Sequence, residues 1–302
     1  MSDERRITIF DLSHSEQSAL DELVLQWRAK RPRNNLRSAF YDMKNAHRHL
    51  MTSNAPTVVK RRKFVLGWSA TAVDKLNRRC NIDGFYDTQG RDLDSLGLSV
   101  LEDENRLRSE LSQAGVSSLI HAVSWLVTVQ GDTSAGEPEV LILPRDATNA
   151  TGVWDVRRRG LKSFLSLNGW DDNGEPTAMT MYLHGDMAGS GVNVIMEKVG
   201  GAWTVDRKDH GYGLPVDPLR YRPRLGRPFG SSRISRAVMS IHEQALGAMI
   251  RADVNGEAYS LPRYALLGAG EEAFQNADGS AKPTWQAAWD AIWAIGDDET
   301  LA

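Results

Sequence analysis

The chain has 302 residues, of which 41% are hydrophobic, and a formal net charge of −3 at pH 7. That apolar share can build the core of one large or two ordinary domains. The weak net charge excludes condensation of the whole chain on DNA, so any contact with a polyanion must be local. A single cysteine, Cys80, excludes an internal disulfide and favours a reducing cytoplasm. The charged start MSDERRITIF predicts no signal peptide. No run of about 18 apolar residues predicts a membrane span, so we expect a soluble protein.

Two amphipathic helices are predicted near the N-terminus. The first covers residues 15–30, with Ser15 or Ser18 as its cap and Pro32 as the residue that ends it. Its apolar face carries Leu20, Leu23, Val24 and Trp27. The second covers residues 35–50, and its face carries Leu36, Phe40, Met43 and His47. A basic cluster at residues 60–63, interpreted mainly as a solvated face, precedes a short helix over residues 70–79.

The periodicity then changes from helical to that of strands. Helices are predicted over residues 102–114 and 116–124. Strands are predicted over residues 126–130, 140–143, 162–168, 178–184, 193–199 and 202–205. Asn173-Gly174 and Gly200-Gly201 predict tight primed hairpin turns, which need positive φ. Short strands with close turns indicate an antiparallel sheet flanked by helices, an α+β domain.

An arginine-rich segment leads into a long helix further along the chain. Six guanidinium groups follow in a short span: Arg220, Arg222, Arg224, Arg227, Arg233 and Arg236. Ser231 or Ser232 is expected to cap a helix that runs to about Asp253, which makes it about 33 Å long. An apolar seam recurs at steps of four and three, namely Ile234, Val238, Ile241, Ala245, Ala248 and Ala252, with Met249 beside it. This spacing is typical of a helix that packs along another helix.

The C-terminal region predicts an extended segment over residues 259–267 and helices over residues 271–274 and 283–295. In the last helix, Trp285, Trp289 and Trp293 recur every four residues and share one face. This stripe is either part of a core or a surface for a neighbouring subunit.

Each possible catalytic motif lacks a residue that its chemistry needs. Residues 226–232 lack the spacing and the lysine of a phosphate loop, and His242-Glu243 lacks a second histidine four residues on. Residues 171–174 resemble a calcium loop in composition only. Neither Cys80 nor Ser231 has a histidine at a sequence spacing that would indicate an activated nucleophile. We therefore expect no enzyme activity, metal or cofactor, although a triad dispersed along the sequence stays open.

Several long blocks resemble portal proteins of tailed bacteriophages, in the branch common in phages of actinobacteria. Two of them are RYRPRLGRPFGSSRISRAVMSIHEQAL and YSLPRYALLGAGEEAFQNADGSAKPTWQAAW. The earlier blocks GWSATAVDKLNRRCNIDGF and SSLIHAVSWLVTVQGD follow the family's order, and together the likeness spans residues 67–295. The resemblance implies a ring of about twelve subunits at one capsid vertex, made in the bacterial cytoplasm. It also implies as partners double-stranded DNA, the terminase large subunit, the head-tail connector and the major capsid protein.

The resemblance also implies a division of the chain. Residues 1–60 and 61–230 would form the helical and α+β parts of a wing, residues 231–255 a stem helix, and residues 256–302 part of a clip. The family's second stem helix, tunnel loop and crown do not follow Ala302, so we expect a truncated chain or another polypeptide that completes it. A capsid-associated scaffold or adaptor, and a non-functional prophage remnant, are the alternatives, and an enzyme such as a nuclease would need clustered carboxylates or histidines.

Candidate roles follow for particular residues in such a ring. Candidates for the DNA channel or for contacts between subunits are Arg233, Arg236, Glu243 and Arg251. Candidates for stem packing are Ile234, Val238, Ile241, Ala245 and Met249, and Trp285, Trp289 and Trp293 are candidates for a clip interface. Arg233 and Arg236 would pair with a neighbouring subunit or weakly guide the DNA backbone, without reading bases. Pairing with carboxylates inside one subunit is the open alternative.

Overall fold

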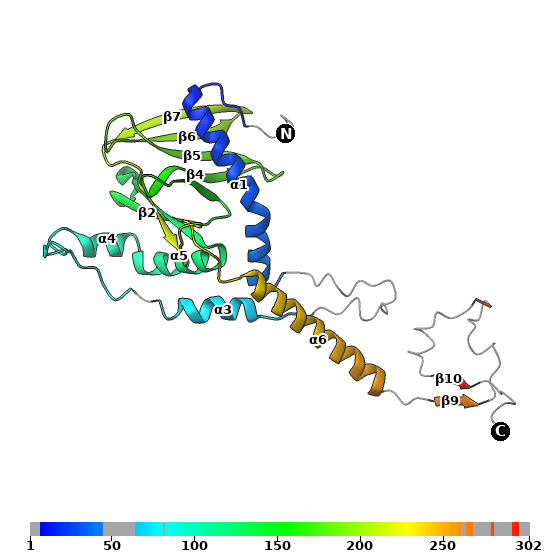
Figure 1. Cartoon of the computed structure of the whole chain (residues 1–302). Coiled ribbons are helices and arrows are strands. Elements are labelled where there is room, and N and C mark those ends of the chain that lie inside the picture. The colour runs from blue at the N-terminus through cyan, green and yellow to red at the C-terminus, as the bar shows by residue number, and fades with distance from the viewer. Residues whose placement is uncertain are drawn as a thin grey trace. The chain divides into compact units, whose positions relative to one another are not determined.

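The computed structural model describes residues 7–44, 64–80, 82–260, 264–267, 279–280 and 292–295 (Figure 1). The chain divides into two units, Met1–Lys44 with Trp68–Val238 and Asn45–Gly67 with Met239–Ala302. The described residues form five α-helices, two antiparallel sheets and a short parallel strand pair. The fold is therefore mixed α+β, as the sequence predicts.

The first unit contains a five-stranded antiparallel sheet in the order β3-β4-β5-β6-β7. Its strands are β3 (Ala150–Asp155), β4 (Gly160–Trp170), β5 (Pro176–His184), β6 (Gly191–Val199) and β7 (Ala202–His210). The last four contain the strands predicted from alternation. Strand β3 was not predicted, because its first four residues are all buried, and a strand covered on both faces shows no alternation of apolar and polar residues.

The hairpin turns agree with the prediction in one case and correct it in the other. Gly200 and Gly201 have φ values of 60° and 90°, which is the tight primed turn expected between β6 and β7. Between β4 and β5 only Gly174 has positive φ. There the Asp171 Oδ1 accepts hydrogen bonds from the backbone N–H groups of Asn173 and Glu175. The side chain thus stabilises a wider loop than the predicted primed turn.

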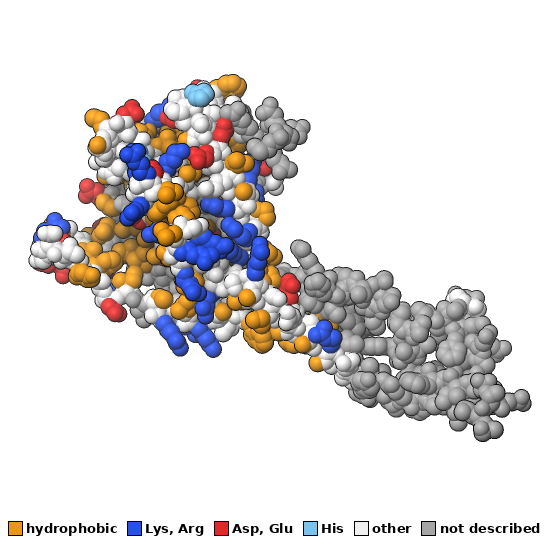
Figure 2. All heavy atoms as spheres, viewed as in Figure 1, with side chains coloured by type: hydrophobic (Ala, Val, Ile, Leu, Met, Phe, Trp, Pro, Cys, Tyr) orange, Lys and Arg blue, Asp and Glu red, His pale blue; other side chains and the backbone are white. Residues whose placement is uncertain are grey.

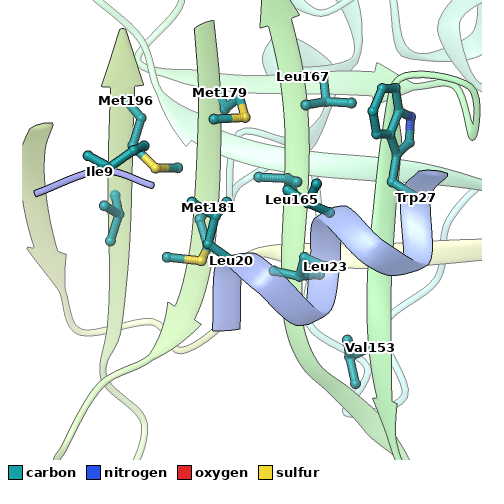
Figure 3. Close-up of a cluster of buried hydrophobic side chains, with 12 residues drawn as sticks. Ile9, Leu20, Leu23, Trp27, Val153, Leu165, Leu167, Met179, Met181 and Met196 are labelled. Atoms are coloured by element: carbon teal, nitrogen blue, oxygen red, sulfur yellow. The ribbon is translucent and has the colours of Figure 1, made fainter. Parts of the chain in front are cut away.

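Helix α1 (His14–Tyr41) lies across one face of the large sheet (Figure 3). Leu20, Leu23, Val24 and Trp27, the predicted apolar face, are buried there. They pack against side chains of the sheet that include Leu165, Leu167, Met179, Met181, Val194 and Met196. Removing this apolar area from water, at about 25 cal/mol per Å², is the main force that holds helix and sheet together.

Two features of α1 correct the sequence analysis. Its cap is Ser13 and not Ser15 or Ser18: Ser13 and Glu16 bond to each other's backbone N–H in a capping box. Pro32 does not end the helix, which continues to Tyr41. An internal proline costs about 3 kcal/mol, and the burial of Trp27 before it and Asn34 and Phe40 after it offsets that cost. The predicted second helix over residues 35–50 is therefore the end of α1 as far as Tyr41, and His47 lies outside the described residues.

The first unit also contains a smaller antiparallel sheet in the order β2-β1-β8. Its strands are β1 (Val123–Gln130), β2 (Val140–Arg145) and β8 (Val216–Arg220). The first two were predicted, whereas β8 was missed because it contains Pro218, and β8 is an edge strand, where proline is tolerated. Trp125 of β1 packs on Phe164 with 5.0 Å between ring centroids, so a second core forms behind the large sheet.

The helices before β1 begin and end differently from the prediction of 102–114 and 116–124. They are α3 (Trp68–Asn77), α4 (Leu98–Glu104) and α5 (Leu107–His121). Asn105 separates α4 from α5: its side chain donates to the Val140 carbonyl and accepts from the Ile142 N–H. Ala122 ends α5 with φ of 89°, and pairing of Val123 and Ser124 with β8 overrides their local helical pattern.

The second unit contains most of α6 (Arg236–Ser260) and a parallel pair of strands, β9 (Tyr264–Leu267) and β10 (Ile292–Ile295). Leu246 and Ile250 of α6 are buried with Phe64 and Leu66 packed against them. The predicted helix over residues 283–295 is corrected at its end, because residues 292–295 pair with β9. Trp293 lies in β10, so the three tryptophans do not form one helical stripe, and Trp285 and Trp289 lie outside the described residues.

Candidate functional site

The strap, as we call residues 220–235, is anchored on the C-terminal end of α5. The last carbonyl groups of a helix have no partner within the helix and need donors from elsewhere. The backbone N–H of Arg233 donates to the Leu119 oxygen (2.7 Å) and that of Tyr221 to the Ala122 oxygen (2.9 Å). The Ser232 hydroxyl donates to the Ile120 oxygen. These bonds fix the path of the strap over the first unit.

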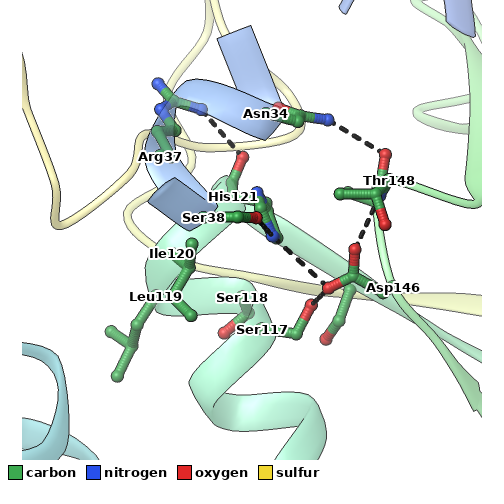
Figure 4. A network of polar contacts seen from close by, with 12 residues as sticks. Asn34, Arg37, Ser38, Ser117, Ser118, Leu119, Ile120, His121, Asp146 and Thr148 are labelled. Atoms are coloured by element: carbon green, nitrogen blue, oxygen red, sulfur yellow. Dashed lines mark hydrogen bonds and ion pairs between the residues drawn. The ribbon is translucent and has the colours of Figure 1, made fainter. Parts of the chain in front are cut away.

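Helix α1 supplies a further donor to the same place. The Arg37 Nη1 donates to the His121 oxygen over 3.1 Å, and the Asn34 amide donates to the Ala147 oxygen (Figure 4). A cation at a helix C-terminus also interacts favourably with the negative end of the helix dipole. The second half of α1 and the strap therefore meet at the end of α5.

The Ser232 hydroxyl is thus bonded to the end of α5. The prediction that Ser231 or Ser232 caps the following helix is therefore wrong. Ser235 takes that role, because its Oγ accepts a hydrogen bond from the Val238 N–H. Helix α6 accordingly begins at Arg236, several residues after the predicted start.

The strap itself turns back sharply over a short distance. The backbones of Arg224 and Arg227 exchange both hydrogen bonds, at 3.2 and 2.7 Å. Gly230 has φ of 84°, and a Cβ there would lie 2.2 Å from the Tyr221 oxygen, so only glycine fits. Leu225, between the two arginines, is fully exposed.

These contacts gather a group of cations that we call the basic surface, Lys30, Arg33, Arg37, Arg220, Arg224 and Arg227. Figure 2 shows lysine and arginine side chains concentrated on one face of the first unit. Lys30 lies over the Phe229 ring (5.0 Å) and Arg220 over the Trp154 ring (5.2 Å), which is favourable for both cations. In the part of the chain that the structure describes, none of the six forms an ion pair.

The ionisation of two of these cations is perturbed by their surroundings. Burial, followed by the charge of Arg33, lowers the pKa of Lys30 to about 8. Burial, followed by the charges of Arg33 and Arg227, lowers the pKa of Arg37 to about 10. Like charges held together without counterions destabilise the fold. A partner that brings negative charge would relieve this repulsion.

A second polar cluster lies beside the first, around His121 (Figure 4). The Ser117 hydroxyl donates to the Asp146 Oδ2 (2.5 Å), which lies 3.5 Å from the His121 Nε2. The Ser38 hydroxyl lies 3.4 Å from the same nitrogen, and no partner of the opposite ring nitrogen, Nδ1, occurs among the described residues. A catalytic triad needs the carboxylate and the nucleophile on opposite nitrogens of the ring. The contacts of this cluster link α1, α5 and the β2–β3 loop.

The ionisation of this cluster follows from burial and charge. Burial lowers the pKa of His121, an effect that Asp146 opposes and Arg37 reinforces. For Asp146, burial raises the pKa, but His121 and the bonds from Ser117 and Thr148 outweigh it, so the pKa is lowered. Asp146 thus stays ionised and accepts hydrogen bonds.

The four residues predicted for the DNA channel or for contacts between subunits are not among the six of the basic surface. Arg233 and Arg236 are exposed where the strap enters α6, and neither forms an ion pair among the described residues. Further along α6, Glu243 is half-buried and Arg251 exposed. Lys30, Arg33 and Arg37 were not among the predicted site residues, although their spacing of three and four places them on one helical face. The expectation that Pro32 ends the helix concealed this face.

The predicted seam residues have different environments. Ile234 is buried, but it precedes the first turn of α6, while Val238 and Ala245 are half-buried. Ile241 and Met249 are 57% and 43% exposed. The face of α6 that is buried carries His242, Leu246 and Ile250 instead. The apolar edge with Ile241 and Met249 therefore stays available to a partner.

No group of three or more histidine, cysteine, aspartate or glutamate side chains among the described residues could hold a metal ion. No helix in the described part of the chain has the length and apolar composition needed to cross a bilayer. In comparisons with known proteins, no family model matches the chain, and no curated protein matches it.

Proposed function

We propose that this chain is a portal subunit of a tailed bacteriophage, which forms a ring-shaped conduit for double-stranded DNA at the capsid vertex. The observation that carries the proposal is α6, a straight 25-residue helix that keeps an apolar edge exposed. The first unit would be the wing, α6 the stem, and the residues after α6 part of the clip. The subunit would have no chemistry of its own, since a separate terminase would supply the energy.

The physical reason for a ring lies in the two sides of α6. One side packs Leu246 and Ile250 in its own unit, while Ile241, Ala248, Met249 and Ala252 are exposed on the other. Small residues beside Ile and Met allow a neighbouring helix to approach closely. Rotational repetition of such a contact closes a ring, and it repeats the charges of Arg233, Arg236, Glu243 and Arg251 around the axis.

A conduit function also limits how strongly the channel through the ring can hold DNA. Each arginine that neutralises a phosphate adds salt-dependent affinity, which rises with the number of contacts. A conduit must let the duplex slide, so Arg233 and Arg236 would guide the backbone weakly or pair between subunits. Connector, terminase and major capsid protein would bind the outer surfaces of the ring.

The test is the assembly state of the purified chain and of two α6 variants. We expect native mass measurement and negative-stain images to show closed rings for the unaltered chain. Ile241→Glu should abolish them, because it places a charge on the apolar edge. The control Gln244→Glu introduces the same residue at an exposed position outside that edge and should leave rings intact. Monomers of the unaltered chain, or rings of Ile241→Glu, would contradict the proposal.

An adaptor or scaffold protein of the capsid is the second candidate function, and a non-functional prophage remnant of a portal protein is the inactive alternative. The basic surface favours the adaptor, because it is suited to an acidic partner whether or not a channel forms. An adaptor would give stable complexes with capsid proteins but no particles with a central hole in the same images.

A further inference from the structure

A second strongly charged region lies in the first unit, on the segment of residues 82–104, which we call the acidic arm. It carries seven carboxylates against a single cation, Arg91: Asp83, Asp87, Asp92, Asp94, Glu102, Asp103 and Glu104. The arm consists of a loop and α4, and it projects from one side of this unit (Figure 1). Its charge is opposite to that of the basic surface.

Most of this negative charge is not neutralised by neighbours. Asp87 pairs with Arg91 (2.9 Å) and Glu102 with Arg108 (3.6 Å). Asp94, Asp103 and Glu104 are exposed, and they form no ion pair within the described ranges. The arm also exposes apolar side chains, with Leu96 61% and Val100 57% exposed. A protein interface has an apolar core and a polar rim, and the arm offers exposed side chains for both.

We propose that the acidic arm of one copy docks on the basic surface of a second copy, in a head-to-tail contact. Carboxylates such as Asp103 and Glu104 would face Arg33 and Arg227 of the neighbour. Leu225, the exposed tip of the strap, would be the apolar anchor on the basic side. Exposed ion pairs contribute only about 0.2–1 kcal/mol each, so the contact needs several pairs together with this anchor.

The two faces are different surfaces of the same chain, so the contact is heterologous. Repeated head-to-tail contacts either close a ring or extend as a filament, depending on the rotation between copies. Ring closure rests on the proposed function, whereas the contact itself does not. The contact would explain why Lys30 and Arg37 stay desolvated beside other cations: the neighbour's carboxylates complete their environment.

A second copy fits the basic surface better than nucleic acid does. Every chain brings one acidic arm for each basic surface, so the two are always present in equal numbers. The net charge of −3 works against adhesion of the whole chain to DNA. In addition, Arg224 and Arg227 flank the exposed Leu225 along the strap, and a phosphate backbone would leave that leucine uncovered. DNA binding at the basic surface is therefore the alternative outcome of the test.

The experiment uses two full-length variants with opposite defects. The first, Arg33→Glu with Arg227→Glu, makes the basic surface acidic and leaves Arg37 and its bond to α5 in place. The second, Asp103→Lys with Glu104→Lys, makes the arm basic at the end of α4, where cations are favourable. By sedimentation at physiological salt, each alone should associate at least about tenfold more weakly than the unaltered chain. An equimolar mixture should recover association, because each arm then faces a surface of opposite charge.

Matched controls carry the same change of net charge elsewhere on the first unit. Arg157→Glu with Lys198→Glu controls for the first variant, and Asp172→Lys with Asp186→Lys for the second; all four positions are exposed. Association of both controls should stay within about threefold of the unaltered chain.

Failure of the mixture to associate, or equal weakening by the controls, would overturn the contact. If the mixture fails and the unaltered chain binds a DNA duplex through Arg33 and Arg227, the basic surface is a nucleic-acid site instead. Negative-stain images distinguish a failure of this inference from a failure of the proposed function. Open filaments that both variants disrupt and the mixture restores would support the contact and reject the portal. Closed rings that neither variant affects would reject the contact and support the portal.

Discussion

Arg37, near the end of α1, donates a hydrogen bond to the main-chain oxygen of His121, the last residue of α5. These residues are 84 positions apart in the sequence. The bond satisfies a helix-terminal carbonyl and brings the basic face of α1 to the strap. The candidate site therefore depends on how one helix is terminated.

Arg37→Met is expected to destabilise the chain by about 1 kcal/mol. The lost charged hydrogen bond, at about 1.5–3 kcal/mol, exceeds the relief from repulsion by Arg33 and Arg227. Urea unfolding measures the difference. Arg33→Met is the control on the same face, and its exposed side chain should change stability by less than about 0.5 kcal/mol. A variant at Arg37 that is as stable as the unaltered chain would reject this role for the bond.

Lys30→Met is expected to stabilise the isolated chain, by on the order of 1 kcal/mol below pH 8. The folded pKa of about 8 lies below that of the unfolded chain, so folding disfavours the charged form. The cost is fully present below pH 8 and disappears as the pH rises toward the unfolded value near 10.5. Unfolding curves from pH 7 to 10 should therefore converge for the variant and the unaltered chain. A constant difference over that range would show that desolvation of the charge is not the cause.

Glu16→Gln is expected to destabilise the chain by about 1 kcal/mol at pH 7. The hydrogen bond with Arg207 is the largest of several effects that lower the pKa of Glu16 to about 2. Because the folded pKa is depressed, this stabilisation is present above pH 4.5 and is lost as the pH falls toward 2. Thermal unfolding at pH 7 and pH 3 tests both statements.

Glu22→Gln is the control for that experiment. Glu22 also pairs across α1 and the sheet, with Lys162 at 2.9 Å, but it has no role in the cap. It should cost less than about 0.5 kcal/mol. Glutamine can keep the capping-box hydrogen bond at position 16, so the two variants compare the loss of charge alone. Equal losses would mean that the Glu16–Arg207 pair stabilises the chain no more than the Glu22–Lys162 pair.

Gly230→Ala is expected to cost at least about 2 kcal/mol and to displace the strap. A methyl group there would collide with the Tyr221 oxygen at a backbone angle that favours glycine. Gly226→Ala is the control, because no atom lies within 4 Å of its Cβ position. Hydrogen exchange of the Tyr221 and Ser231 amides should accelerate only in the first variant. Unchanged exchange in Gly230→Ala would mean that the strap tolerates a side chain there.

Much of the local structure could be predicted from periodicity and turn chemistry. The buried face of α1 from Leu20 to Trp27 follows from helical spacing, and β4 to β7 follow from alternation. The site was predicted only in part. The arginines of the strap stand out in the sequence, but nothing local indicates that Lys30, Arg33 and Arg37 lie beside them.

The sequence by itself determined the buried face of α1 from Leu20 to Trp27, the Gly200-Gly201 hairpin and the existence of the long helix α6, because these depend on residues within one or two turns of each other. It determined neither the bounds of α6 nor the face of α6 that is buried. Tertiary structure decided three other features: α1 continues through Pro32, α5 ends at His121, and the strap meets α1. Burial of Trp27 and Phe40 outweighs the loss of one helical hydrogen bond at Pro32. The unpaired carbonyls at the end of α5 select Arg37, Tyr221, Ser232 and Arg233 as donors from distant parts of the chain. Such choices depend on the sum of contacts in the folded chain, which no short stretch of sequence contains.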